Sequence, residues 1–141
     1  MKLEIKHLAP YLPYGLKILD IYKERDYIKE ITGVYSFENI FTDDGDITFE
    51  CIKPILRPMS GFPLYFEYLF ETTDDQNIKD FLDEDFLYDK GIYSWEELVF
   101  AEPNYIPYGT LQVLLKYHFD VFELIPAGIA VSIHDIGKVV A

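Results

Sequence analysis

Three histidines and one cysteine are the side chains of this sequence that most commonly bind metals or act as nucleophiles. His7, His118 and His134 lie far apart, and none belongs to a His-Glu-x-x-His or Cys-x-x-Cys pattern that would bring metal ligands together. We therefore expect no metal and no cofactor. The apolar surroundings of His118 favour a hydrogen-bonded core histidine, and Cys51, with no basic pair beside it, is expected to be an unreactive buried thiol.

Carboxylates are abundant, but their spacing matches no catalytic or calcium-binding motif. The run Asp43-Asp44-Gly45-Asp46 lacks the alternating acids and the final glutamate of an EF-hand loop, so it is interpreted as charge in a turn. Ser60 lacks the Gly-x-Ser-x-Gly frame of a nucleophile elbow, and neither a Walker loop nor a dinucleotide-binding glycine pattern occurs. No catalytic residue is predicted, and the chain is not expected to be an enzyme.

Tyrosine is the residue type that could bind a partner. The chain contains 12 tyrosines and 11 phenylalanines, and tyrosine is enriched where one side of a residue stays in water. Two similar segments, residues 11–16 and 105–110, each contain Pro-Tyr-Gly, which is typical of a turn that opens a strand or a helix. We expect a partner-binding patch at these two turns, and the alternative is that the rings pack over the rim of a sheet. The four rings are Tyr11, Tyr14, Tyr105 and Tyr108.

The formal net charge of −13 restricts the classes of partner. Residues 43–106 contain four Lys/Arg and sixteen Asp/Glu, so most of the excess lies in the middle of the chain. A protein that binds nucleic acid or anionic lipid needs a basic surface, and neither is therefore expected as a direct partner. A protein partner remains open.

Composition indicates a folded cytoplasmic protein. Half of the 141 residues are hydrophobic, which is too many for a disordered acidic segment. Cys51 can form no internal disulfide, the first residues do not resemble a signal peptide, and no apolar stretch is long enough to span a membrane.

The elements that must position these side chains form a single α+β domain over residues 1–141. Period-2 alternation predicts an antiparallel β meander over residues 14–56, with residues 23–26 as one turn and the Asp-Gly pair at 44–45 as a hairpin. Pro54 and Pro58 should end the strand or hold it at a sheet edge, with sheet pairing stopping near Pro54, because proline donates no hydrogen bond to a ladder. Residues 62–70 are apolar at nearly every position, so periodicity cannot separate a strand from a helix there.

Helices are expected in the second half of the chain. Asp74 and Asp75 could cap a short helix that runs through Phe86, and Ser94 with Glu97 has the spacing of a capping box. Residues 108–124 are apolar on nearly every face, which predicts a long buried helix packed against the sheet, followed by a last strand near residues 129–133. The side chains expected to be most buried there are Leu114, Leu115, Val121 and Phe122.

Three further segments are His7-Leu8-Ala9-Pro10-Tyr11-Leu12-Pro13-Tyr14-Gly15-Leu16-Lys17, Lys53-Pro54-Ile55-Leu56-Arg57-Pro58-Met59-Ser60, and residues 117–125 with Gly128-Ile129-Ala130. In these segments the chain resembles a group of small uncharacterised phage or prophage proteins of gut Bacteroides-type bacteria. The resemblance implies a genomic setting only and assigns no function to any residue.

Three functions from different classes follow. The leading hypothesis is a non-enzymatic, phage-associated accessory or protein-interaction protein. The alternative is an acidic DNA mimic, in which carboxylates of residues 74–102 replace phosphates and inhibit a host DNA-binding protein. A carboxylate-dependent hydrolase is the remote alternative, because the distance between two catalytic carboxylates is not fixed by sequence spacing.

Overall fold

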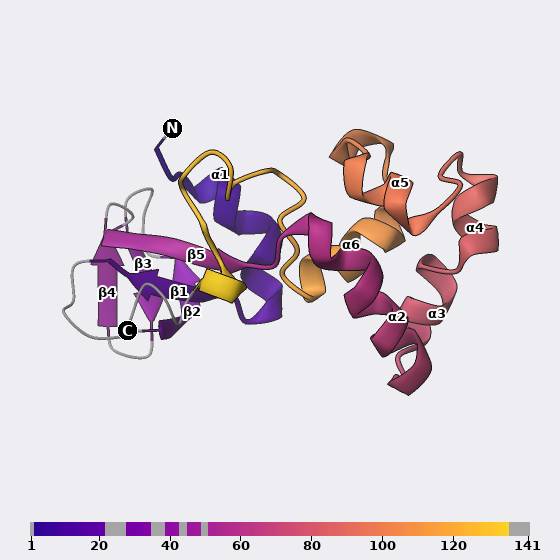
Figure 1. The fold of residues 1–141 in the computed structure, drawn as a ribbon. Coiled ribbons are helices and arrows are strands. Elements are labelled where there is room, and N and C mark those ends of the chain that lie inside the picture. The colour runs from indigo at the N-terminus through magenta and orange to yellow at the C-terminus, as the bar shows by residue number, and fades with distance from the viewer. Residues whose placement is uncertain (1, 22–27, 35–38, 43–44, 49–50, 136–141) are drawn as a thin grey trace.

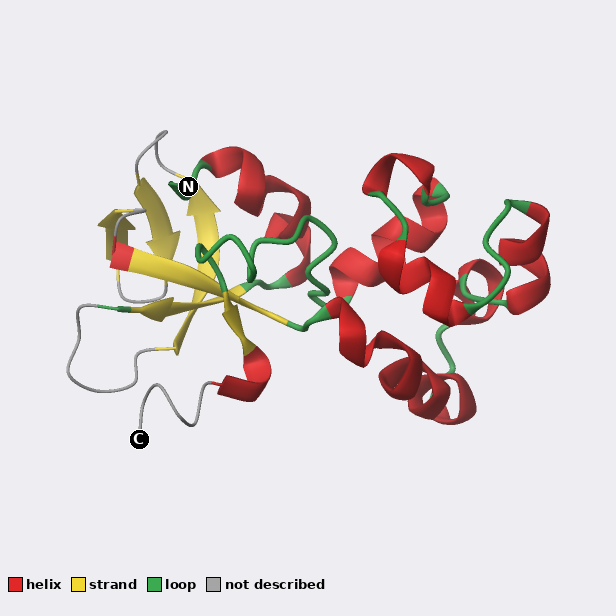
Figure 2. Ribbon diagram, turned by 45° about the horizontal axis from the view of Figure 1, so that its top comes forward, coloured by secondary structure: helices red, strands yellow, loops and turns green. Residues whose placement is uncertain are grey.

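The computed structural model describes residues 2–21, 28–34, 39–42, 45–48 and 51–135, and shows an α+β fold of two lobes (Figure 1). A sheet lobe carries the N-terminal helix, and a helical lobe follows β5 and ends before β6 (Figure 2). The strands are β1 (Lys17–Asp20), β2 (Ile28–Val34), β3 (Asn39–Thr42), β4 (Gly45–Thr48), β5 (Ile52–Leu56) and β6 (Val131–Ser132). The helices are α1 (Ile5–Leu8), α2 (Phe62–Thr72), α3 (Gln76–Phe81), α4 (Glu84–Asp89), α5 (Trp95–Phe100) and α6 (Tyr108–Lys116). Short 3₁₀ helices cover Ala9–Tyr14, Met59–Gly61, Pro103–Tyr105 and Ile133–Asp135.

The sheet contains the expected meander. Strands β1 to β4 pair antiparallel in chain order, and Thr42 pairs with Gly45 across the predicted Asp-Gly hairpin. The turn predicted at residues 23–26 and the acidic pair at 43–44 lie outside the described residues. Strand β5 pairs with β1, so the sheet order is β4-β3-β2-β1-β5-β6.

Pairing of β5 with β1 stops at Pro54, as predicted, but the strand neither ends there nor lies at a sheet edge, because it continues to Leu56 beside β6. Strand β5 pairs antiparallel with β1 through Pro54 and parallel with β6 from Ile55 onward. The Ile21 N–H donates to the Cys51 carbonyl at 2.9 Å, and alternate residues of an antiparallel strand face the same neighbour. The nitrogen of Pro54 therefore faces away from β1, so its missing N–H removes no hydrogen bond to that strand. Pairing with β6 begins only at the next residue, Ile55.

Side-chain caps divide the helical lobe into short helices. Asp75 caps α3 by accepting the Asn77 N–H, and Ser94 caps α5 by accepting the Glu97 N–H, as the sequence predicts. The single helix expected through Phe86 is instead two helices, because Asp83 accepts backbone N–H groups and starts α4. The ambiguous segment at 62–70 belongs to α2, which buries Phe62 and Phe66 one helical turn apart.

Helix α6 ends at Lys116, so the prediction of one helix over residues 108–124 is wrong. His118 has a φ of 62°, which breaks the helix, and the chain then runs beside the end of β5. The Arg57 N–H donates to the His118 carbonyl and the Asp120 N–H donates to the Arg57 carbonyl, both at 2.8 Å. Residues 117–124, which follow α6, are largely apolar because they pack between the lobes. Leu114, Leu115 and Val121 are buried as expected, whereas Phe122 is 37 % exposed.

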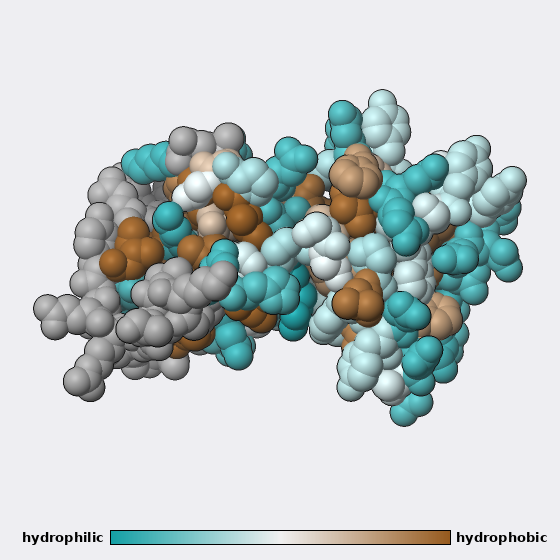
Figure 3. Space-filling model, viewed as in Figure 1, coloured by the Kyte–Doolittle hydropathy of each residue, from teal (hydrophilic) through white to brown (hydrophobic). Residues whose placement is uncertain are grey.

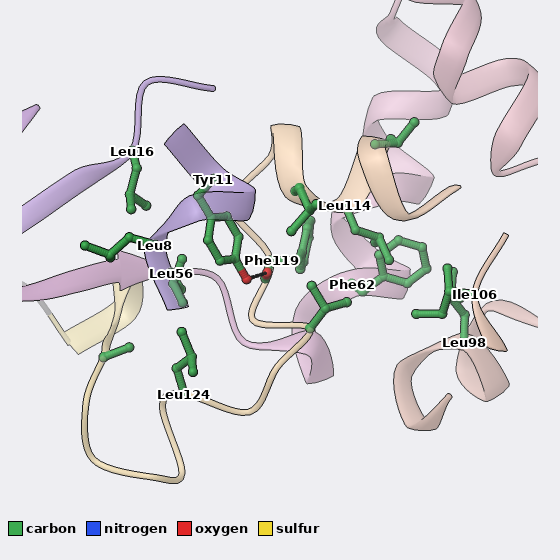
Figure 4. Close-up of a cluster of buried hydrophobic side chains, with 14 of the residues drawn as sticks. Leu8, Tyr11, Leu16, Leu56, Phe62, Leu98, Ile106, Leu114, Phe119 and Leu124 are labelled. Carbon is green, nitrogen blue, oxygen red and sulfur yellow. Dashed lines mark hydrogen bonds between the residues drawn. The ribbon is translucent and has the colours of Figure 1, made fainter. Parts of the chain in front are cut away.

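One hydrophobic core extends through both lobes. At their junction the Phe119 ring lies 5.6 Å from that of Phe62 and 5.4 Å from that of Phe66, measured between centroids. Figure 4 shows the rings of Phe62 and Phe119 between Leu8 and Leu56 of the sheet lobe and Leu98 of the helical lobe. In the described part of the chain, no helix has the length and apolar character needed to cross a membrane.

Candidate partner-binding site

Tyr11, the first tyrosine of the predicted patch, is a core residue. Its side chain is 0 % exposed, and its hydroxyl donates to the Phe119 carbonyl at 2.6 Å (Figure 4). Burial, with a smaller contribution from the charge of Asp120, raises the pKa of this hydroxyl far above its usual range. The hydroxyl therefore stays protonated and joins the sheet lobe to the segment that leaves α6. Its assignment to a partner surface is wrong.

The other three tyrosines lie around the start of α6 in two separate hollows. Tyr105 and Tyr108 are 74 % and 75 % exposed and line a shallow hollow of about 480 Å³ together with Phe86 and Lys90. Tyr14 is half-buried and lines a smaller hollow of about 130 Å³, which shares Gly109 with the first. The structure thus brings two of the four predicted rings into one exposed place, and the single four-ring patch is wrong.

A third hollow was not predicted and lies where the lobes meet. This junction cleft has a volume of about 610 Å³ and is formed by residues 58–60, 99–103 and parts of 120–126. Its lining is largely apolar, and Phe100 stands at the cleft with 86 % of its side chain exposed. Three carboxylate residues also line it: Glu102, Asp120 and Glu123.

Asp120 holds the wall of the junction cleft in place. It is 5 % exposed, and its two carboxylate oxygens accept the N–H groups of Leu124 at 2.7 Å and Ile125 at 2.9 Å. Burial raises the pKa of this carboxyl, although both backbone hydrogen bonds act in the opposite direction. The arrangement organises the loop after α6, which is a structural role for the most buried carboxylate of the cleft.

The structure keeps the other reactive side chains apart. His118 Nε2 lies 2.7 Å from the Tyr14 carbonyl, and burial lowers the pKa of the imidazole, so the neutral ring donates this hydrogen bond. His7 Nδ1 accepts the Glu4 N–H within α1, and half-buried Cys51 Sγ lies 3.1 Å from Thr48 Oγ1. In the described ranges, no three His, Cys, Asp or Glu side chains are placed to hold a metal ion.

The surface of the helical lobe combines acidic and aromatic side chains. Residues 62–116 include twelve Asp/Glu and three lysines, a net charge of −9 out of −13 for the chain. Seven large hydrophobic side chains of this lobe are each at least 60 % exposed. They are Leu64, Tyr68, Tyr88, Tyr93, Phe100, Tyr105 and Tyr108. On the face in Figure 3, separate hydrophobic residues lie among hydrophilic ones on the helical lobe, and the scale places tyrosine on its hydrophilic side.

Sequence reasoning missed Phe100, although a signal for it exists. In α5, Trp95, Leu98 and Val99 share one face by helical spacing and pack against the core. Phe100 is apolar but falls off that face, and an apolar residue out of phase with a short amphipathic helix points to solvent. The junction cleft itself has no local signal, because its three segments are distant in sequence.

Comparison of the chain with protein-family models, with characterised proteins and with solved structures gives no significant match. The functional argument therefore depends on the geometry and chemistry of the chain itself.

Proposed function

We propose that this chain is a non-enzymatic protein-interaction protein whose helical lobe binds a basic partner protein. The observation that carries the proposal is the surface of the helical lobe. Seven large hydrophobic side chains are exposed there, and residues 62–116 carry a net charge of −9. Exposed apolar side chains mark interaction sites where they cluster, whereas isolated ones do not, and four of the seven are placed in two pairs, Tyr105 with Tyr108 and Tyr88 with Tyr93.

Charge and aromatic rings would contribute differently to this binding. Complementary charge raises the association rate and disfavours acidic partners, while buried aromatic anchors supply most of the affinity. Tyr105 and Tyr108 share one hollow, and the rings of Tyr88 and Tyr93 contact each other at 5.0 Å between centroids. These two pairs are the rings that we expect a partner to cover.

The distribution of the aromatic rings favours a protein partner over the DNA-mimic hypothesis. A DNA mimic needs a continuous stripe of carboxylates with the spacing of phosphates. In this lobe, exposed tyrosines interrupt the acids: Tyr88 precedes Asp89, and Tyr93 lies close to Glu96 and Glu97 in the sequence. The binding experiment described below can still support a role as a DNA mimic, if duplex DNA displaces the partner.

The proposed setting is a phage-associated accessory role in the bacterial cytoplasm. It rests on the resemblance of the two ends and the middle of the chain to phage-type proteins and on the single cysteine. The acidic surface disfavours direct binding to nucleic acid or to anionic membranes. For the hydrolase hypothesis, the candidate carboxylate in the junction cleft is Asp120. Both of its oxygens accept backbone N–H groups, which favours a structural role for this residue over a catalytic one.

The proposal is tested by identifying and reconstituting a partner. The protein is immobilised, exposed to a lysate of Bacteroides-type bacteria, and the retained proteins are identified by mass spectrometry. The strongest candidate is purified, and its affinity is measured by calorimetry against the wild type and against a variant with Tyr88, Tyr93, Tyr105 and Tyr108 replaced by serine. We expect a basic partner, and an affinity for the variant lower by about tenfold or more.

A matched control replaces two exposed hydrophobic residues of the sheet lobe, Ile21→Ser with Ile133→Ser, and should bind like the wild type. Equal binding by the four-tyrosine variant would contradict the proposal. If a stoichiometric amount of duplex DNA displaced the purified partner, the DNA-mimic function would replace the proposed one.

A further inference from the structure

The junction cleft has the size and lining of a binding site. Its volume of about 610 Å³ falls within the range of about 300–1,000 Å³ that is typical of ligand pockets. It opens between the C-terminal end of α5, the Pro58–Ser60 segment and the loop after α6. Asp120 fixes that loop through two backbone hydrogen bonds, so the cleft has a built wall.

Two phenylalanines expose apolar surface at this cleft. Phe100 is 86 % exposed and Phe122 is 37 % exposed, and both line the hollow. Burial of an aromatic side chain in a partner contact stabilises a complex by removing apolar surface from water. Phe100 is free for such a contact, because Leu98 and Val99 already supply the packing of α5 against the core.

The charged residues that line the junction cleft are all acidic. Glu102 and Glu123 are exposed there, and neither forms an ion pair with a residue that the structure describes. Asp120 adds a carboxylate deeper in the wall. No lysine, arginine or histidine is among the described lining residues. An occupant that carries positive charge beside an apolar group is therefore complementary to the cleft.

We propose that the junction cleft binds a short basic segment of the partner protein, with one apolar anchor inserted beside Phe100. Lysine or arginine side chains that flank the anchor would lie against Glu102 and Glu123. This inference rests on the proposed function and identifies the junction cleft as the part of the helical lobe that recognises the partner. A second copy of this chain is a poor occupant, since each copy carries a net charge of −13.

The probe for this site is a displayed library of random peptides. The library is selected on the wild-type protein and then depleted on a variant that combines Phe100→Ser with Glu102→Lys. We expect the surviving sequences to carry a large apolar residue flanked by lysine or arginine. Survivors without excess positive charge, or the absence of any enriched sequence, would overturn the inference.

The enriched peptide is then synthesised with a fluorescent label, and its dissociation constant is measured by anisotropy. Phe100→Ser and Glu123→Lys should each weaken binding by about tenfold or more, whereas Tyr93→Ser, which changes an exposed ring outside the cleft, should have little effect. All three positions are exposed, and circular dichroism checks that each variant is folded.

The two proposals fail in distinguishable ways. If the four-tyrosine variant loses the purified partner but Phe100→Ser and Glu123→Lys bind the peptide like the wild type, the cleft inference is overturned and the proposed function stands. If no basic protein and no basic peptide binds the wild type, both are overturned.

Discussion

Tyr11 and Tyr105 show that one residue type in one sequence context can have opposite structural roles. They hold equivalent positions in the two similar segments around Pro-Tyr-Gly, yet Tyr11 is fully buried and Tyr105 is 74 % exposed. The difference arises from Phe119, whose carbonyl accepts the Tyr11 hydroxyl across the junction of the lobes. Local sequence patterns cannot predict this hydrogen bond, because its two residues are 108 positions apart.

The Tyr11 hydroxyl is expected to stabilise the fold. Tyr11→Phe removes a hydrogen bond but keeps the ring, so unfolding in urea should show a loss of about 0.5–1.5 kcal/mol. The loss stays moderate because the Phe119 carbonyl also accepts the Val121 N–H. Tyr108→Phe is the matched control and should leave the free energy of unfolding unchanged. Equal effects of the two substitutions would show that the Tyr11 hydrogen bond does not contribute to stability.

His118 makes stability depend on pH with a defined sign. Burial lowers the pKa of its imidazole in the folded state, so the unfolded chain takes up the proton first as the pH falls below about 6.5. The stability associated with the neutral ring is present above the unfolded pKa and is lost as the pH falls through the folded pKa. His118→Gln retains a side-chain donor without a titrating group.

We therefore expect the wild type to lose more stability than His118→Gln when the pH is lowered from about 7.5 to about 5.5. Urea unfolding of both proteins at the two pH values measures the difference. The other titrating groups are shared, so their contributions cancel in the comparison. An equal loss in both proteins would assign the pH dependence to other residues.

At the scale of elements, the sequence predicts local structure better than pairing or length. The Asp-Gly hairpin and the caps at Asp75 and Ser94 depend on neighbouring residues, and all three are confirmed. The end of α6 was mispredicted because neither proline nor glycine marks it. The helix ends at Lys116, and two residues later His118 adopts a left-handed conformation and its carbonyl accepts the N–H of Arg57, a residue far away in the sequence.

The two glycines of the Pro-Tyr-Gly turns are required for different reasons. Gly15 has a φ of 65°, a conformation that favours glycine, and ends the first 3₁₀ helix. Gly109 lies in the first turn of α6, where a Cβ atom would collide with the ring of Phe81. Thr110 strengthens the same contact by donating its hydroxyl to the Phe81 carbonyl at 2.5 Å.

Gly109→Ala should destabilise the protein by about 1–3 kcal/mol, because the Phe81 ring, or α3 with it, must shift to admit the methyl group. Gly61→Ala is the matched control, since no atom lies within 4 Å of its Cβ position. Thermal unfolding followed by circular dichroism measures both variants. A Gly109→Ala midpoint equal to that of the wild type would mean that the α3–α6 contact is looser than described.

At the scale of the whole molecule, one core supports two lobes of different character. The α+β class followed from composition and periodicity, whereas the insertion of the helical lobe between β5 and β6 did not. Parallel pairing of β5 with β6 and the junction cleft both arise from contacts between distant segments. The predicted aromatic surface is retained only in Tyr105 and Tyr108, because burial depends on such contacts.

The fold is expected to need no metal ion. The hydrophobic core is continuous through both lobes, and the described residues offer no metal-binding group of three or more side chains. Thermal unfolding with and without EDTA should therefore give the same midpoint. A markedly lower midpoint in EDTA would indicate a structural metal and contradict this expectation.

If the helical lobe binds a basic partner protein, as we propose, the complex should protect that lobe from amide hydrogen exchange. Exchange measured on the protein alone and on the protein saturated with its purified partner locates the contact without a mutation. Slower exchange is predicted in residues 62–116 and in the loop that lines the junction cleft, with strands β1 to β4 unchanged. Protection confined to those strands, with no change in the helical lobe, would contradict the claim.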